Sequence, residues 1–134
     1  MFDVRGSKSV GSKPPLRSHE DLDAYQLSME LLVRVHALCS KLPPEEKYDL
    51  ARQMRRASKS IPATIAEGFS KRASAKEFKQ YMRMAMGSAN EMETHLRIAL
   101  RLGHLVGAGG EELIDGYNHV GRQLNRLITT WRRY

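Results

Sequence analysis

Residues 74–103 read SAKEFKQYMRMAMGSANEMETHLRIALRLG, and this stretch decides the fold. Its apolar residues follow one another at alternating steps of four and three, the heptad spacing of a helix that packs along one stripe. Ser74 and Glu77 form a capping box at the start, and Gly103 is a stop signal at the end. The sequence therefore predicts a long amphipathic helix between these signals. Its stripe consists of Phe78, Met82, Ala85, Ala89, Met92, Leu96 and Ala99.

Three further segments show helical spacing. One is predicted over residues 21–41, before a pair of prolines, and one over residues 44–69. The apolar spacing passes through Pro62 without a change of phase, so we expect the second of these helices to bend there but to continue. The last follows the glycine-rich residues 107–110 and runs to the C-terminus. The stripes are Leu27, Leu31, Val35, Leu38 and Leu42; Leu50, Met54, Ala57, Ile61, Ile65 and Phe69; and Leu113, Tyr117, Val120, Leu124, Leu127 and Trp131.

Four such helices joined by short turns bury their stripes most simply in an all-α, antiparallel, up-down-up-down four-helix bundle. No segment has the pattern of a strand. Residues 1–18 contain four basic residues against one acid and have no apolar period, so we expect a flexible basic N-terminal tail. Residues 19–134 are then a single bundle domain, which suits a chain of 134 residues.

The composition also bears on where the protein works. No apolar run is long enough to cross a bilayer, and the N-terminus lacks the apolar core of a signal peptide. The single cysteine, Cys39, cannot form an internal disulfide and is expected to be a small apolar residue within a helix. We expect a cytoplasmic protein with no membrane contact.

Residues for catalysis or metal binding do not occur at the required spacing. No histidine follows a glutamate by three positions, as the ligands of di-metal bundles do, and no phosphate-binding glycine loop is present. Glu67 and Glu91 lie in helical sequence where the spacing suggests no histidine or lysine partner. We therefore expect no enzyme activity, no cofactor, no metal and no small-molecule substrate. Glu67, Asn90 and Glu91 are instead expected to make structural polar contacts between helices or subunits, beside small residues such as Gly68.

Residues 55–96 read RRASKSIPATIAEGFSKRASAKEFKQYMRMAMGSANEMETHL. This segment resembles the bacterial four-helix-bundle family named after 23S ribosomal RNA intervening sequences, notably at residues 55–57, 60–62, 65–68 and 88–94. With looser similarity on both sides, the resemblance covers residues 20–131. It implies a non-enzymatic bundle that assembles into a ring, commonly a homopentamer. Related bundles are the accessory variability determinant proteins of diversity-generating retroelements, which bind a reverse transcriptase and its RNA.

The formal net charge of +7 favours a polyanionic partner. On a helical wheel, four basic residues of the second helix lie opposite its apolar stripe; this set, Arg52, Arg55, Arg56 and Lys59, is named the basic ridge here. The third and fourth helices add Lys79, Arg83, Arg122 and Arg126, whereas the first helix is mainly acidic. Two interpretations stay open: a solvated charged face, or contact with the phosphates of RNA or DNA through charge and shape.

The third helix has a second flank beside its stripe, made of Tyr81, Met84, Ser88, His95 and Leu102. Two buried sides exceed what one bundle needs, so this flank is predicted to be an oligomer interface. The resulting hypothesis is a ring-forming basic scaffold that binds RNA, or RNA together with a reverse transcriptase. The alternative is a purely structural or protein-interaction oligomer, in which the bases balance acids on neighbouring subunits.

Overall fold

The computed structural model describes residues 16–105, 107 and 109–132. They form four α-helices: α1 (Asp23–Cys39), α2 (Leu50–Ser70), α3 (Ala75–Arg101) and α4 (Gly110–Thr130). Two short 3₁₀ turns, η1 (His19–Asp21) and η2 (Pro44–Glu46), precede α1 and α2. The described part of the chain contains no strand. The predicted all-α class is confirmed.

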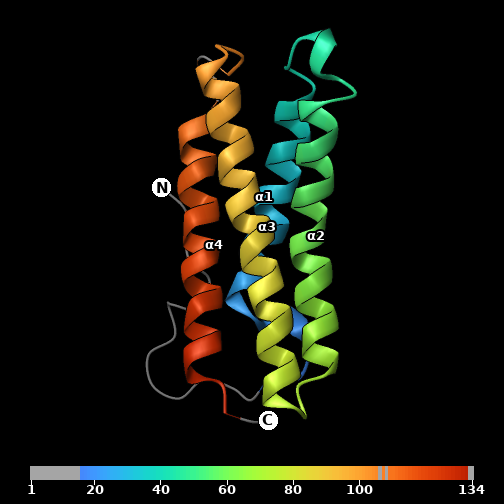
Figure 1. Ribbon diagram of the computed structural model, residues 1–134, viewed down its shortest axis with the longest axis vertical. Helices are drawn as coiled ribbons and strands as arrows, with labels where there is room; N and C mark the ends of the chain where they lie inside the picture. The colour runs from blue at the N-terminus through green and yellow to red at the C-terminus, as the bar shows by residue number, and fades with distance from the viewer. Residues whose placement is uncertain (1–15, 106, 108, 133–134) are drawn as a thin grey trace.

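The helices stand side by side, and each runs antiparallel to the one before it (Figure 1). α1 packs against α2 and α4, and α3 packs against the same two helices, whereas the backbones of the diagonal pairs, α1 with α3 and α2 with α4, lie farther apart. This is the up-down-up-down arrangement that short turns favour. Each helix therefore has two neighbours and one outward face.

The core consists of the predicted stripes. Almost every stripe residue is buried, and only Leu127 and Trp131, near the end of α4, are half-buried. The Trp131 ring closes the lower end of the core by stacking on Phe78, with ring centroids 4.0 Å apart. The steps of three and four thus predicted the buried face correctly, because residues at those steps share one side of a helix.

The helix ends differ from the predictions, and at the start of the second helix the reason is a 3₁₀ turn that forms in place of an α-helical turn. Pro44 begins η2 and not the α-helix, because the backbone N–H groups of Glu46, Lys47 and Asp49 each donate to the carbonyl three residues earlier. The predicted start of the second helix at residue 44 is therefore wrong, and α2 begins at Leu50. The fourth helix likewise ends at Thr130, short of the C-terminus.

Pro62 lies inside a continuous α2, which confirms that the helix passes through it. The bend at Pro62 stays a prediction. At the start of α3 the Ser74 hydroxyl accepts a hydrogen bond from the Glu77 N–H at 3.2 Å. The reciprocal half of the predicted capping box is replaced, since the Ser74 N–H donates to the Lys71 carbonyl at 3.0 Å.

A Schellman motif ends α3. Gly103 has a φ of +76°, its N–H donates to the Leu100 carbonyl, and the His104 N–H donates to the Ala99 carbonyl. Glycine adopts this left-handed conformation without the steric cost of a Cβ. The stop signal is thus confirmed, with the last helical residue at Arg101.

The predicted flexible tail falls mainly on residues 1–15, which lie outside the described residues. Leu16 packs against the core, and the backbone N–H groups of Arg17 and Ser18 donate to the Asp21 carboxylate at 2.8 and 3.1 Å. These bonds hold the pKa of Asp21 below its ordinary value. Residues 16–18, which the sequence assigns to the tail, thus pack and hydrogen-bond with the bundle.

α2 and α3 approach closely at Gly68. A Cβ placed on Gly68 would lie 2.5 Å from the Tyr81 Cβ and 2.7 Å from the Met82 Cε. Both distances are shorter than van der Waals contact, so only glycine fits at this crossing. The crossing fixes the spacing of the two helices below the basic ridge.

Candidate nucleic-acid interface

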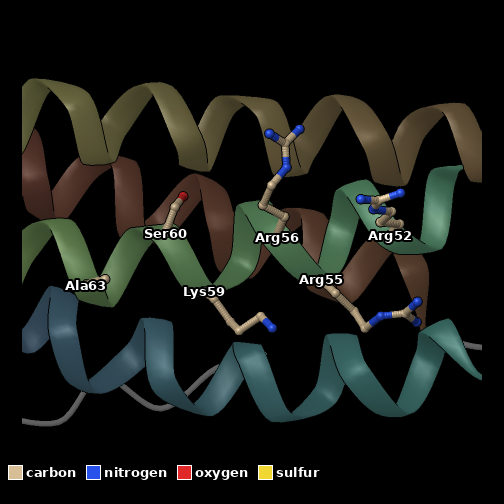
Figure 2. A pocket seen from close by; sticks show the side chains of 6 residues that line it. All are labelled: Arg52, Arg55, Arg56, Lys59, Ser60 and Ala63. Atoms are coloured by element: carbon tan, nitrogen blue, oxygen red, sulfur yellow. The ribbon is translucent and has the colours of Figure 1, made fainter. Parts of the chain in front are cut away.

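The basic ridge lines an open groove on the outer face of α2. The groove has a volume of about 490 Å³, and its walls are Arg52, Arg55, Arg56, Lys59, Ser60 and Ala63. Figure 2 shows Arg56 and Ser60 directed toward α3, and Arg55 and Lys59 directed toward α1. The four predicted cations are therefore brought together around one hollow.

Three cations of the groove are exposed: Arg52, Arg56 and Lys59. Arg52 and Arg56 are one helical turn apart, so their Cβ atoms are about 6 Å from each other. Within the described ranges none of the three takes part in an ion pair. The one acidic residue of α2 is Glu67, two turns beyond Lys59. The positive charge of the groove is thus left without a nearby carboxylate on its own helix.

Arg55 differs from the other three because the fold holds it. It is half-buried, and its guanidinium donates to the Lys47 carbonyl at 3.3 Å. Burial raises the pKa of the neighbouring Cys39 thiol, and the charge and hydrogen bond of Arg55 oppose that rise. Arg55 therefore joins α2 to the segment before it while leaving its charge at the edge of the groove.

Small residues create the hollow. The Ser60 hydroxyl donates to the Ala57 carbonyl at 2.8 Å and hydrogen-bonds with the Ser88 hydroxyl of α3, also at 2.8 Å. Ala63, one turn after Lys59, has no side chain beyond its Cβ. The wall contains no aromatic residue, so the groove lacks a stacking platform for bases. Its chemistry is that of a phosphate site, because its walls offer guanidinium and ammonium donors.

The other predicted cations lie on other faces. Arg83 on α3 and Arg122 and Arg126 on α4 are exposed, and Lys79 on α3 is half-buried. None of them lines the groove. The sequence prediction therefore divides into a clustered set on α2 and a dispersed set on α3 and α4. Ser60 and Ala63 were missed, although small residues one turn from a run of bases were a visible signal.

The predicted interface flank on α3 has three residues that pack within the same chain and two that are exposed. Tyr81 packs over Gly68, Ser88 pairs with Ser60, and His95 is only 7% exposed, so these three contact α2 or the core of the same chain. Met84 and Leu102 are 54% and 56% exposed. The interface itself stays a prediction, and only the last two members have a free apolar surface.

The predicted structural carboxylates have local partners. The Tyr81 hydroxyl donates to Glu67 Oε2 at 3.3 Å, which links α3 to α2 as expected. Glu91 Oε2 lies 2.9 Å from His95 Nε2, one turn along α3. The expectation that Glu91 has no histidine partner was wrong, because positions i and i+4 share a helix face. Asn90 is exposed, and its carbonyl accepts from the Thr94 hydroxyl.

Among residues 16–105, 107 and 109–132 no three side chains of the histidine, cysteine or acidic type gather as metal ligands would. In the same ranges no helix combines the length and apolar character needed to cross a bilayer.

Fold and site together define a helical bundle of the up-down-up-down type with a cationic groove on one helix. The profile of the 23S rRNA-intervening sequence protein family matches residues 20–126, and the chain belongs to this family. The chain is also similar to a solved protein of unknown function from the S23 ribosomal protein family of Bacteroides thetaiotaomicron. That structure shares 26% identity and a TM-score of 0.71, over 80% of this chain and 96% of the other. No curated protein sequence matches the chain.

Proposed function

We propose that the protein is a non-enzymatic, oligomeric scaffold that binds nucleic acid, with RNA favoured over DNA, through the groove on α2. The observation that carries the proposal is the clustering of Arg52, Arg56 and Lys59 around one hollow without a paired acid. Because each cation can neutralise a phosphate and release its counterions, such a groove favours a nucleic-acid backbone.

The preference for RNA rests on the family, whose name refers to an intervening sequence in ribosomal RNA. The proposal includes a cytoplasmic location, assembly as a ring of five subunits, and a role as accessory subunit to a reverse transcriptase. The ring and the reverse-transcriptase partner come from the resemblance of residues 55–96 to such bundles, and the location comes from the composition of the sequence. The absence of aromatic residues from the groove adds that recognition is by charge and backbone shape, with little base preference.

The test is a titration of labelled single-stranded RNA against two triple variants of equal charge. One variant carries Arg52→Gln, Arg56→Gln and Lys59→Gln, which empties the groove of its exposed cations. Glutamine keeps the helix propensity and length of the side chain while removing its charge. Arg55 is left in place because it supports the Lys47 carbonyl.

The matched control removes the same charge from the dispersed set, as Arg83→Gln, Arg122→Gln and Arg126→Gln. We expect the groove variant to lose roughly tenfold or more in affinity near physiological salt and the control to lose much less. Equal losses would mean that binding follows net charge and not the groove. Unchanged affinity in both variants, or no binding by the wild type, would refute the proposal.

The alternative, a structural or protein-interaction oligomer, is supported by a different observation. A second groove, between α3 and α4, has walls of both charge signs and is partly apolar. Such a surface suits a protein partner better than a polyanion. Wild-type protein that oligomerises but binds neither RNA nor DNA at low salt would favour this alternative.

A further inference from the structure

The second groove runs between the C-terminal half of α3 and the N-terminal half of α4. It has a volume of about 720 Å³. Its apolar surface comes from Ile98, Leu100, Leu102 and Ile114, and Ile98 and Leu102 are 42% and 56% exposed. Apolar side chains at a solvent-filled groove remain costly until something covers them. An open, partly apolar groove between two helices can accept another helix.

The walls of this groove carry opposite charges. α3 contributes Arg97 and Arg101, and α4 contributes Glu111 and Asp115. Arg97 approaches Glu93 on its own helix only at 3.9 Å, at the limit of an ion pair on the surface. The carboxylates of α4 would repel a polyanion. The occupant of the groove must therefore have an apolar edge and fit beside both positive and negative side chains.

The same chain presents such an edge on α1. Met29 and Val33, one turn apart, are 40% and 66% exposed, and the exposed Ala37 continues the line. Among the described residues α1 packs on α2, α4 and η1, and no other helix of this part of the chain covers the outer face. α1 also has two acids, Asp23 and Glu30, against one arginine, which complements the arginine wall of α3.

The α1 face and the groove lie at the same height along the bundle. Arg34 of α1 forms an ion pair with Glu112 of α4, and this contact holds the pKa of Glu112 below its ordinary value. Val33 is the neighbour of Arg34, and Glu111 is the neighbour of Glu112. The outer face of α1 and the α3–α4 groove are therefore related by a rotation about the bundle axis with little translation along it.

We propose that α1 of one copy lies in the α3–α4 groove of the next copy, with Met29 and Val33 against Ile98 and Leu102. The inference deepens the oligomer of the proposed function by naming its two surfaces. Because the two surfaces differ, the contact is head-to-tail. A linear row of subunits therefore has an unused α1 face at one end and an unused groove at the other. Head-to-tail contacts form a ring when the rotation from copy to copy closes, and a filament when it does not.

The experiment is light scattering without nucleic acid on Val33→Glu and Ile98→Glu. Met84→Glu, on the α3 flank that the sequence predicts as an interface, is the comparison that distinguishes the two surfaces. All three positions are exposed, so the monomer tolerates a carboxylate, and circular dichroism verifies the fold of each. We expect the wild type and the Met84 variant to be oligomers, and the two interface variants to be monomers of 15.2 kDa.

Mixing the two interface variants makes the test specific. The Val33 variant keeps an intact groove and the Ile98 variant keeps an intact α1, so a head-to-tail contact yields a heterodimer of twice 15.2 kDa and nothing larger. A mixture that stays monomeric, an interface variant that stays fully assembled, or a Met84 variant that dissociates would overturn the proposal.

A monomeric wild type would also overturn it and leave the groove to a helix of another protein. The readout involves no RNA and leaves Arg52, Arg56 and Lys59 unchanged. Failure of the nucleic-acid proposal is therefore distinguishable from failure of this one.

Discussion

Substitution of Gly68 by alanine tests the close crossing of α2 and α3. In a helix, alanine is normally favoured over glycine by about 0.5–1 kcal/mol. Here the new Cβ would lie 2.5 Å from the Tyr81 Cβ, about 1 Å inside ordinary contact. The Met82 Cε can rotate away, but the Tyr81 Cβ is fixed to the backbone of α3, so the helices must separate. Overpacking of this kind costs about 1–3 kcal/mol, and the net expectation is a loss of about 0.5–2 kcal/mol in the free energy of unfolding.

Gly87→Ala is the matched control, because Gly87 lies within α3 and a Cβ there meets no atom within 4 Å. This variant should gain about 0.5–1 kcal/mol from helix propensity alone. Both free energies are measured by urea unfolding followed by circular dichroism, at one protein concentration. Since both variants share the propensity term, their difference isolates the packing cost. A Gly68 variant as stable as the Gly87 variant would contradict a close crossing of α2 and α3 at Gly68.

Two further perturbations address a helix cap and the buried titratable groups. Ser74→Ala removes the acceptor of the Glu77 N–H and should lower the free energy of unfolding in urea by about 1 kcal/mol. The control Ser70→Ala, at an exposed site near the end of α2, should lower it less. Equal losses in the two variants would show that Ser74 does not cap α3. Burial raises the pKa of the Cys39 thiol and the Tyr117 hydroxyl, so the unfolded chain releases these protons first. The stabilising contribution of each group is full below its ordinary value, 9.0 for the thiol and 10.0 for the tyrosine hydroxyl. Above that value it falls by about 1.4 kcal/mol per pH unit. The melting temperatures of Cys39→Ala and Tyr117→Phe should therefore fall less steeply with rising pH than that of the wild type. Equal slopes would contradict the raised pKa values of these two groups.

The core was predictable because a single rule governs it. Steps of three and four mark one helix face whatever the partner helices are, so Phe78, Ile61 and Val120 could be assigned to the interior without knowing the fold. Helix starts were less predictable. Pro44 suits the first turn of an α-helix and of a 3₁₀ turn equally, and only the hydrogen bonds of the folded chain decide between them.

The flank of α3 shows why surfaces were harder to predict than the core. A helix in this bundle touches two neighbours, so its apolar arc is wider than one stripe. Tyr81, Ser88 and His95 lie on the side toward α2, and a flank that suggested a second subunit is partly used within the chain. The α3–α4 groove, by contrast, needs side chains from two helices whose register the sequence does not state.

The salt dependence of RNA binding measures whether the exposed cations of the α2 groove contact phosphates. The slope of log affinity against log salt concentration counts the phosphates neutralised, at about 0.7 for each contact on a single strand. Replacing Arg52, Arg56 and Lys59 with glutamine should make the slope shallower by roughly 2, while the Arg83, Arg122 and Arg126 variant keeps a slope close to that of the wild type. Identical slopes for the wild type and the groove variant would contradict this contact, because the cations removed would then release no counterions.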